Sequence, residues 1–136
     1  MKSLSILLID DDEIERMKFK QVSKKTEFIS TFFEAKNGEN AITLLKNTQP
    51  SFDLIVTDLH MPIMNGFEFL KKLKKNRKFK NIPVVVMSSS QDDKDLKKCF
   101  NIGISGYFTK SLKSSEYISN VVSLLNYWQK SELINL

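Results

Sequence analysis

The chain has 136 residues, 41% of them apolar and 27% charged, with a formal net charge of +5. These values are typical of one soluble globular domain with a sizeable core. The single cysteine, Cys99, excludes an intrachain disulfide and favours a reducing compartment. Acid interrupts the apolar N-terminal stretch at Asp10, too early for a signal peptide, and no run approaches the roughly 20 apolar residues of a membrane span. We therefore expect a cytoplasmic protein with no membrane span.

Extended and helical patterns alternate along the whole chain. Short apolar runs predict strands near residues 4–9, 28–34, 53–57, 82–88 and 105–108. Amphipathic stretches predict helices near residues 13–26, 38–48, 66–76, 93–102 and 113–130, and Asn37-Gly38 and Asn65-Gly66 mark turns into two of them. Five strand–helix repeats indicate an α/β fold with a doubly wound parallel sheet. We expect a single domain over residues 1–136, with its core at about 4–130 and a short apolar tail at 131–136.

The last predicted helix carries an apolar stripe that we expect to pack on the core. The stripe consists of Ile118, Val121, Val122, Leu125 and Trp128. Beyond it, Tyr127, Trp128 and the tail residues Leu133, Ile134 and Leu136 are more apolar than a lone domain needs. Self-association or a partner surface is the alternative use of this end.

The net positive charge comes largely from one run, residues 71–80, at the end of a predicted helix. Cations suit the negative pole of the helix dipole, so a solvated helix end explains the run. Nucleic acid or an acidic partner is the alternative, but no aromatic ladder or nucleic-acid motif accompanies the run. We do not expect nucleic-acid binding.

Two apolar runs end in acid, and this is the strongest functional signal. Residues 4–9 run into Asp10-Asp11-Asp12-Glu13, and residues 54–57 run into Asp58. The carboxyl ends of parallel strands form the ligand-binding edge of open α/β sheets. If the two strands are neighbours, several carboxylates crowd together, which requires a proton or a cation. The later strands add Ser88 and Ser89, then Thr109 and Lys110, at the same edge.

Four segments in order resemble the receiver domain of two-component response regulators, over nearly the whole chain. They are Ile6–Asp12, Asp53–Gly66, Pro83–Ser89 and Gly106–Lys110. The resemblance implies a stand-alone, CheY-like regulator with a flavodoxin-like (βα)5 fold and strand order 2-1-3-4-5. It also implies a phosphorylation switch rather than an enzyme, with self-catalysed phosphorylation and dephosphorylation.

The resemblance assigns the central site to Asp58 and its neighbours. Asp58 matches the phosphoacceptor, which takes a phosphoryl group from a phosphohistidine. Mg²⁺ is the implied cofactor, held directly by Asp11, by Asp58 and by the backbone carbonyl of His60, with Asp10 holding a metal-bound water. Lys110 supplies a positive charge to the phosphoryl oxygens. These roles agree with what phosphoryl transfer requires, namely positioning and neutralisation of charge.

The resemblance also implies a switch and a means of setting the lifetime of the phosphoryl group. Ser88 matches the switch hydroxyl, with Ser89 beside it, and Tyr107 matches the switch aromatic. His60 and Ser90 match the two positions that flank the phosphoryl group and tune its hydrolysis. The same residues have plainer interpretations: a capping role for Asp10 and Asp11, as we expect for Asp12 and Glu13, a satisfied strand-end hydroxyl, a fixed core tyrosine and an exposed loop histidine.

Two positions vary the family pattern. The family usually has proline after the lysine, joined by a cis peptide, whereas Ser111 follows Lys110 here. A cis bond at a non-proline residue costs roughly 3–4 kcal/mol, so either the scaffold enforces it or the loop is trans. Asn65 stands where aspartate is commoner, and asparagine caps a helix equally well.

The implied partners are a sensor histidine kinase or phosphotransfer protein and an unidentified downstream protein. The face formed by the fourth helix, fifth strand and fifth helix is the candidate surface for a homodimer. Three other functions remain as alternatives. They are a flavin or nucleotide site on the same fold, an aspartate-nucleophile phosphatase using Asp10 and Asp12, and a basic nucleic-acid module.

Overall fold

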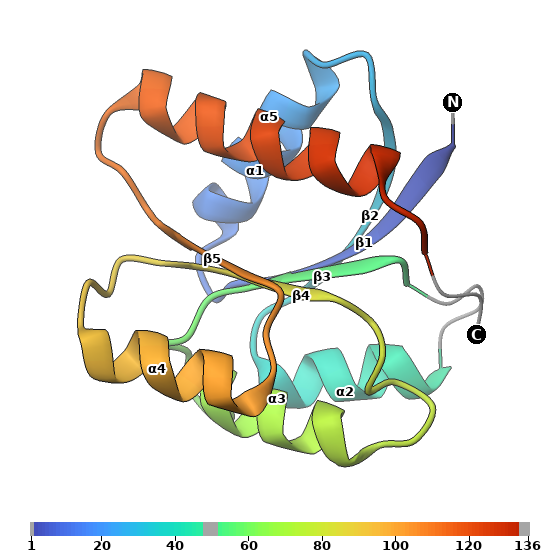
Figure 1. The fold of residues 1–136 in the computed structure, drawn as a ribbon, viewed down its shortest axis with the longest axis vertical. Helices are drawn as coiled ribbons and strands as arrows, with labels where there is room; N and C mark the ends of the chain where they lie inside the picture. Colours follow the sequence, from blue (N-terminus) through green and yellow to red (C-terminus); the bar gives the residue numbers. More distant parts are fainter. Residues whose placement is uncertain (1, 48–51, 134–136) are drawn as a thin grey trace.

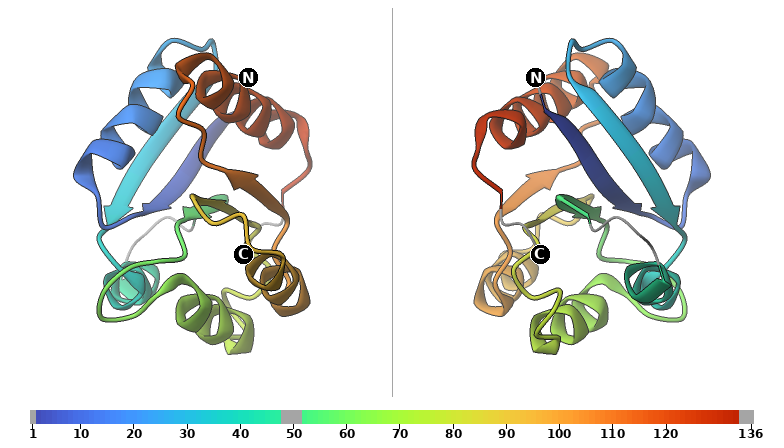
Figure 2. Two further views of the ribbon diagram at one scale, coloured as in Figure 1. Left: turned by 90° about the vertical axis from the view of Figure 1, so that its left-hand side faces the viewer. Right: turned by 90° about the vertical axis from the view of Figure 1, so that its right-hand side faces the viewer.

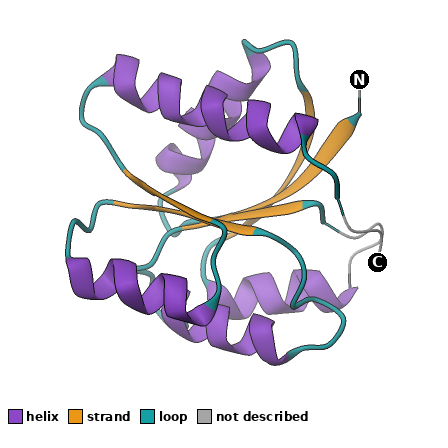
Figure 3. Cartoon of the chain, viewed as in Figure 1, coloured by secondary structure: helices purple, strands orange, loops and turns teal. Residues whose placement is uncertain are grey.

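Strands and helices alternate strictly in the structure, a computed structural model that describes residues 2–47 and 52–133. The strands are β1 (Ser3–Ile9), β2 (Ile29–Ala35), β3 (Leu54–Thr57), β4 (Val84–Ser88) and β5 (Gly106–Thr109). The helices are α1 (Glu13–Lys24), α2 (Gly38–Asn47), α3 (Gly66–Lys75), α4 (Asp93–Ile102) and α5 (Ser114–Lys130) (Figures 1 and 3). All ten predicted elements are confirmed, with their ends displaced by at most two residues.

The five strands form one parallel sheet in the order β2-β1-β3-β4-β5. The predicted flavodoxin-like topology is confirmed. Helices α1 and α5 cover one face, and α2, α3 and α4 cover the other (Figures 1 and 2). The chain leaves β1 toward β2 and then crosses to β3 on the other side. The ends of β1 and β3 therefore form the point where ligands bind in such sheets, at the left of Figure 1.

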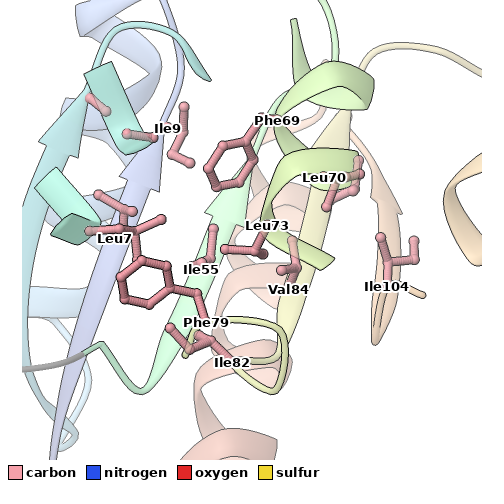
Figure 4. Packing of buried hydrophobic residues seen from close by; sticks show 14 of the residues in the cluster. Leu7, Ile9, Ile55, Phe69, Leu70, Leu73, Phe79, Ile82, Val84 and Ile104 are labelled. Carbon is pink, nitrogen blue, oxygen red and sulfur yellow. The ribbon is translucent and has the colours of Figure 1, made fainter. Parts of the chain in front are cut away.

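Alternation along β1 divides the core into two layers. Leu4, Ile6 and Leu8 belong to the cluster with α1 and α5, and Leu7 and Ile9 belong to the cluster with α2, α3 and α4. Figure 4 shows the second cluster, in which side chains of the sheet meet those of α3. Each large side chain buried in this way contributes roughly 1.5–3 kcal/mol. The packing holds the strand ends in fixed relative positions.

Burial differs between the central strands and the edge strand β2. Every residue of β3 and of β4 is buried, whereas in β2, at one edge, every residue except Ala35 is half-buried or exposed. Strands buried on both faces need apolar side chains at every position, which explains the unbroken aliphatic runs. β3 and β4 are therefore a closely packed support for the loops that follow them.

The apolar stripe of α5 differs from the prediction at two positions. Val121 and Leu125 are fully buried, but Ile118 is 43% exposed and Val122 is 36% exposed. Each of these two residues follows a buried one, Tyr117 or Val121, and is rotated about 100° past the buried face of the helix. At the far end, Leu133 and Trp128 pack against the core and Tyr127 is exposed. The tail residues Ile134 and Leu136 lie outside the described residues.

Side-chain caps fix where four helices begin. At α2, Oδ1 of Asn37 accepts from the amide of Asn40 at 2.8 Å. Asp12 accepts a hydrogen bond from the amide of Ile14, and Asp92 accepts one from the amide of Lys94. Asn65 and Glu68 form a reciprocal capping box at α3. The predicted capping roles of Asp12 and Asn65 are confirmed, and the caps lie at the carboxyl edge of the sheet. The described residues include no helix long and apolar enough to cross a bilayer.

Candidate functional site

Three carboxylates meet at the ends of β1 and β3. Ile9 pairs with Thr57 across these strands, so the residues that follow, Asp10 and Asp58, lie side by side. One oxygen from each of Asp10, Asp11 and Asp58 lies within 4.8 Å of the other two. Asp10 is only 6% exposed, whereas Asp11 is exposed to solvent. The predicted clustering of these three residues is confirmed.

Lys110 reaches the same point from the end of β5. Its Nζ atom lies 2.8 Å from Oδ2 of Asp10 and 3.3 Å from Oδ2 of Asp58. Its backbone N–H donates to the carbonyl of Ser88 at 2.8 Å, which holds the residue beside the end of β4. One ammonium therefore faces two carboxylates across the carboxyl edge of the sheet. The position predicted for Lys110 is confirmed.

The charges at this site are only partly balanced. Burial, reinforced by the negative charge of Asp10, raises the pKa of Asp58 despite the opposing effects of Lys110 and the Leu59 amide. Burial acts to lower the pKa of Lys110, but its hydrogen bond to Asp10 and the nearby carboxylate charges outweigh this and raise the pKa. The lysine is thus held protonated while Asp58 remains costly to ionise. The site favours additional positive charge.

The loop after β3 returns closely on Asp58. The amide of Leu59 donates to Oδ1 of Asp58 at 2.7 Å, and the amide of Gly66 donates to the carbonyl of Leu59 at 2.8 Å. A Cβ atom at position 66 would lie 2.4 Å from the carbonyl oxygen of Asp58, so only glycine fits. In the same loop Ile63 has φ of 68°, a conformation that β-branched residues disfavour. The loop that follows Asp58 thus contains a strained backbone position.

The last residue of β4 and the residues directly after it form a hydrogen-bonded group with Tyr107 of β5. Ser88 is fully buried, and its Oγ accepts from the amide of Ser90 at 3.1 Å. The hydroxyl of Tyr107 donates to the carbonyl of Ser90 at 3.0 Å, and its ring packs against the larger core cluster. Burial raises the pKa of Tyr107, so the hydroxyl keeps its proton as a donor. The adjacent residue, Ser89, is exposed.

Two residues that sequence reasoning did not single out hold this edge together. Arg16 donates to the carbonyl of Asp10 at 2.6 Å and to Oε1 of Glu34 at 3.1 Å, which ties the turn after β1 to β2. Asp95 on α4 accepts from the hydroxyl of Ser90 at 2.7 Å and lies 3.8 Å from Nε2 of His60. Each reaches an element distant in sequence, so no local pattern marks either residue.

The donor set fits a hard divalent cation. Carboxylate oxygens gathered within 4.8 Å of one another are the ligands that Mg²⁺ prefers. The three carboxylates outnumber the single ammonium of Lys110. Burial, to which the charge of Asp10 adds, raises the pKa of Asp58. Asp12, by contrast, is used as a helix cap on the solvent side.

Comparison with known proteins agrees with this geometry. A family model described as the response regulator receiver domain matches residues 6–122. The chain belongs to this family. Receiver domains are signalling switches that relay from histidine kinases to downstream proteins.

Individual relatives support the assignment as a receiver domain. Two-component response regulator ORR11 of Oryza sativa subsp. indica is 32% identical over 111 residues, which cover 82% of this chain and 74% of that protein. The Mn²⁺-bound form of response regulator Rcp1 superposes with a TM-score of 0.89 at 25% identity, covering 97% of this chain and 99% of that one. The phosphorylated cyanobacterial phytochrome response regulator RcpA has the same fold, with a TM-score of 0.92 at 24% identity over 98% of this chain and 100% of that one.

Proposed function

We propose that Asp58 accepts a phosphoryl group from a phosphohistidine of a sensor histidine kinase or phosphotransfer protein, in a Mg²⁺-dependent reaction. The observation that carries the proposal is the convergence of Asp10, Asp11 and Lys110 on Asp58 at the end of a buried strand. Membership of the receiver family supports the same reaction. The domain at residues 1–136 then acts as a switch and not as an enzyme that turns over an external substrate.

The transfer uses the side chains in distinct roles. A carboxylate oxygen of Asp58 forms a bond to phosphorus as the bond from phosphorus to the imidazole nitrogen breaks. The electron pair stays on that nitrogen, which takes up a proton, and Asp58 becomes an acyl phosphate. Lys110, held at the end of β5, faces the developing charge on the phosphoryl oxygens.

Magnesium would be held by the carboxylates of Asp11 and Asp58 and by the backbone carbonyl of His60, with Asp10 holding a metal-bound water. The ion supplies positive charge that offsets the clustered carboxylates and the phosphoryl oxygens. The binding of Mn²⁺ by Rcp1, which is 25% identical to this chain, supports a divalent-cation site.

The switch would begin at Ser88. Its hydroxyl would turn to bond the phosphoryl group, with Ser89 as the adjacent residue. The ring of Tyr107 would then turn inward behind Ser88. The bonds of Ser90 to both residues support a joint movement of the hydroxyl and the ring. The face formed by α4, β5 and α5 would carry the signal to a downstream protein or to a second copy of the chain.

The rival functions fit the site less well. A flavin or nucleotide needs a cavity of roughly 300–1,000 Å³, whereas the pocket lined by Asp10, Asp58 and Lys110 measures about 20 Å³. An aspartate-nucleophile phosphatase would use Asp10 with Asp12, but Asp12 caps α1. Neither alternative gives a role to Asp58.

The test is stoichiometric labelling with a small phosphodonor. We expect the wild-type chain, incubated with radiolabelled acetyl phosphate and Mg²⁺, to take up one base-labile phosphoryl group. Asp58→Asn should take up none, and a chelator should abolish the reaction. Asp93→Asn, which removes an exposed carboxylate on α4, is the matched control and should label fully. Full labelling of Asp58→Asn would refute the proposal.

A further inference from the structure

One carboxylate joins the two loops on either side of the site. Oδ2 of Asp95 accepts a hydrogen bond from Oγ of Ser90 at 2.7 Å, and the same oxygen lies 3.8 Å from Nε2 of His60. Ser90 belongs to the loop after β4, and His60 belongs to the loop after β3. These strands are neighbours in the sheet, so the bridge by Asp95 crosses directly from one loop to the other.

Ser90 is held by four hydrogen bonds. Its amide donates to Oγ of Ser88 at 3.1 Å, and its carbonyl accepts from Tyr107 at 3.0 Å. Its hydroxyl oxygen accepts from the amide of Asp92 at 3.2 Å and donates to Asp95 at 2.7 Å. A hydroxyl has a single proton to donate, and here Asp95 receives it. The bond to a charged acceptor is the strongest type in this set.

Asp95 is well placed to act as an anchor. It lies in the first turn of α4, a helix that Asp92 caps and that Cys99 fastens to the core with full burial. The side chain of Asp95 is 24% exposed and that of His60 is 61% exposed, so Asp95 is the better-packed partner. A half-buried carboxylate on α4 therefore lies within 3.8 Å of a solvent-exposed ring that follows Asp58 by two residues.

We propose that Asp95 is a positioning residue that holds Ser90 and His60 across the mouth of the site and so limits the access of water to the acyl phosphate. This inference rests on the proposed function and adds a third residue to the two flanking positions. In the step it controls, a water oxygen bonds to phosphorus and the bond from phosphorus to the oxygen of Asp58 breaks. The carboxylate is restored, and phosphate leaves with the proton of the water.

The test compares decay of the label with its uptake. In Asp95→Ala the decay rate constant should rise about three- to tenfold, the range expected when a hydrogen bond to a charged group is lost in part. The rate constant of decay should change by a larger factor than the rate constant of uptake. A general loss of structure would instead lower the rate of uptake and the final extent of labelling together. Asp95→Asn keeps an acceptor oxygen for Ser90, so its decay rate constant should lie between those of the wild type and Asp95→Ala. Asp93→Asn removes a neighbouring charge on the same turn and should match wild type.

Non-additivity supplies the second measurement. If Asp95 acts through Ser90, the double variant Asp95→Ala/Ser90→Ala should decay no faster than the faster of the two single variants. Hydrogen exchange in the unlabelled protein should also quicken in both loops, residues 59–65 and 89–92, in Asp95→Ala but not in Asp93→Asn.

Each outcome separates the two proposals. Wild-type chain that takes up label, with Asp95→Ala decaying at the wild-type rate, overturns this inference and leaves the proposed function intact. Multiplicative effects of the Asp95 and Ser90 variants on decay, or faster exchange in only one loop, also overturn it. A wild-type chain that takes up no label overturns the proposed function and the inference with it.

Discussion

The middle of β3 is mainly apolar and closely packed, whereas a charged residue follows its end. Leu54 to Thr57 are all buried, and the side chains of the first three, Leu54, Ile55 and Val56, pack into the two core layers. The next residue, Asp58, is a largely buried carboxylate with a raised pKa. The loop after it contains an isoleucine at positive φ and leads into Gly66, the first residue of α3, which lies in tight contact with the backbone of Asp58. Stability comes from the middle of the strand, and part of it offsets the cost of a charged, strained end.

The largest effect should come from the middle of the strand. Ile55 is fully buried in the cluster with α3, so Ile55→Ala should lower the free energy of unfolding by about 3–4 kcal/mol. Urea denaturation measures the change. The matched control is Ile29→Ala at the edge strand, where the side chain is 56% exposed and the loss should stay below about 1 kcal/mol. Equal losses at the two positions would contradict the comparison.

The next effect tests the tight contact at the end of the strand. Gly66→Ala forces a methyl group against the backbone of Asp58 and Leu59, neither of which can yield without moving the site. We expect a loss of about 1–3 kcal/mol in the free energy of unfolding, together with slower phosphoryl uptake. Gly106→Ala is the control, because its nearest contact would be an ordinary 3.8 Å and both properties should change little.

The smallest effect should have the opposite sign. In metal-free protein at neutral pH, Asp58→Asn removes a carboxylate that is costly to ionise and should raise the free energy of unfolding by about 1 kcal/mol. Because the folded-state pKa of Asp58 is raised, the cost is fully present above that pKa, shrinks as pH falls through it, and is gone only below the lower unfolded-state pKa. The gain should therefore shrink toward acid pH. A gain in the free energy of unfolding that grows on acidification would contradict this, because it would mean that the folded-state pKa of Asp58 is lowered.

Local patterns predicted most of the fold because burial on two faces demands unbroken apolar runs. The acids at positions 10 and 58 were expected to meet because strand ends share one edge, and they do meet. The exposure of Ile118 and Val122 was missed, because apolar spacing along α5 does not specify how far the helix is rotated on the sheet. The roles of Asp95 and Arg16 were missed because His60 and Glu34, which they contact, lie on segments distant in sequence.

Peptide mapping of the phosphorylated chain tests the central claim most directly. Borohydride reduces the acyl phosphate of an aspartate to homoserine, which marks the residue that carried the phosphoryl group. After incubation with Mg²⁺ and acetyl phosphate, we predict homoserine at position 58 and at no other aspartate. Homoserine at position 10 or 11, or a phosphoryl group stable to base on a serine, would contradict the account.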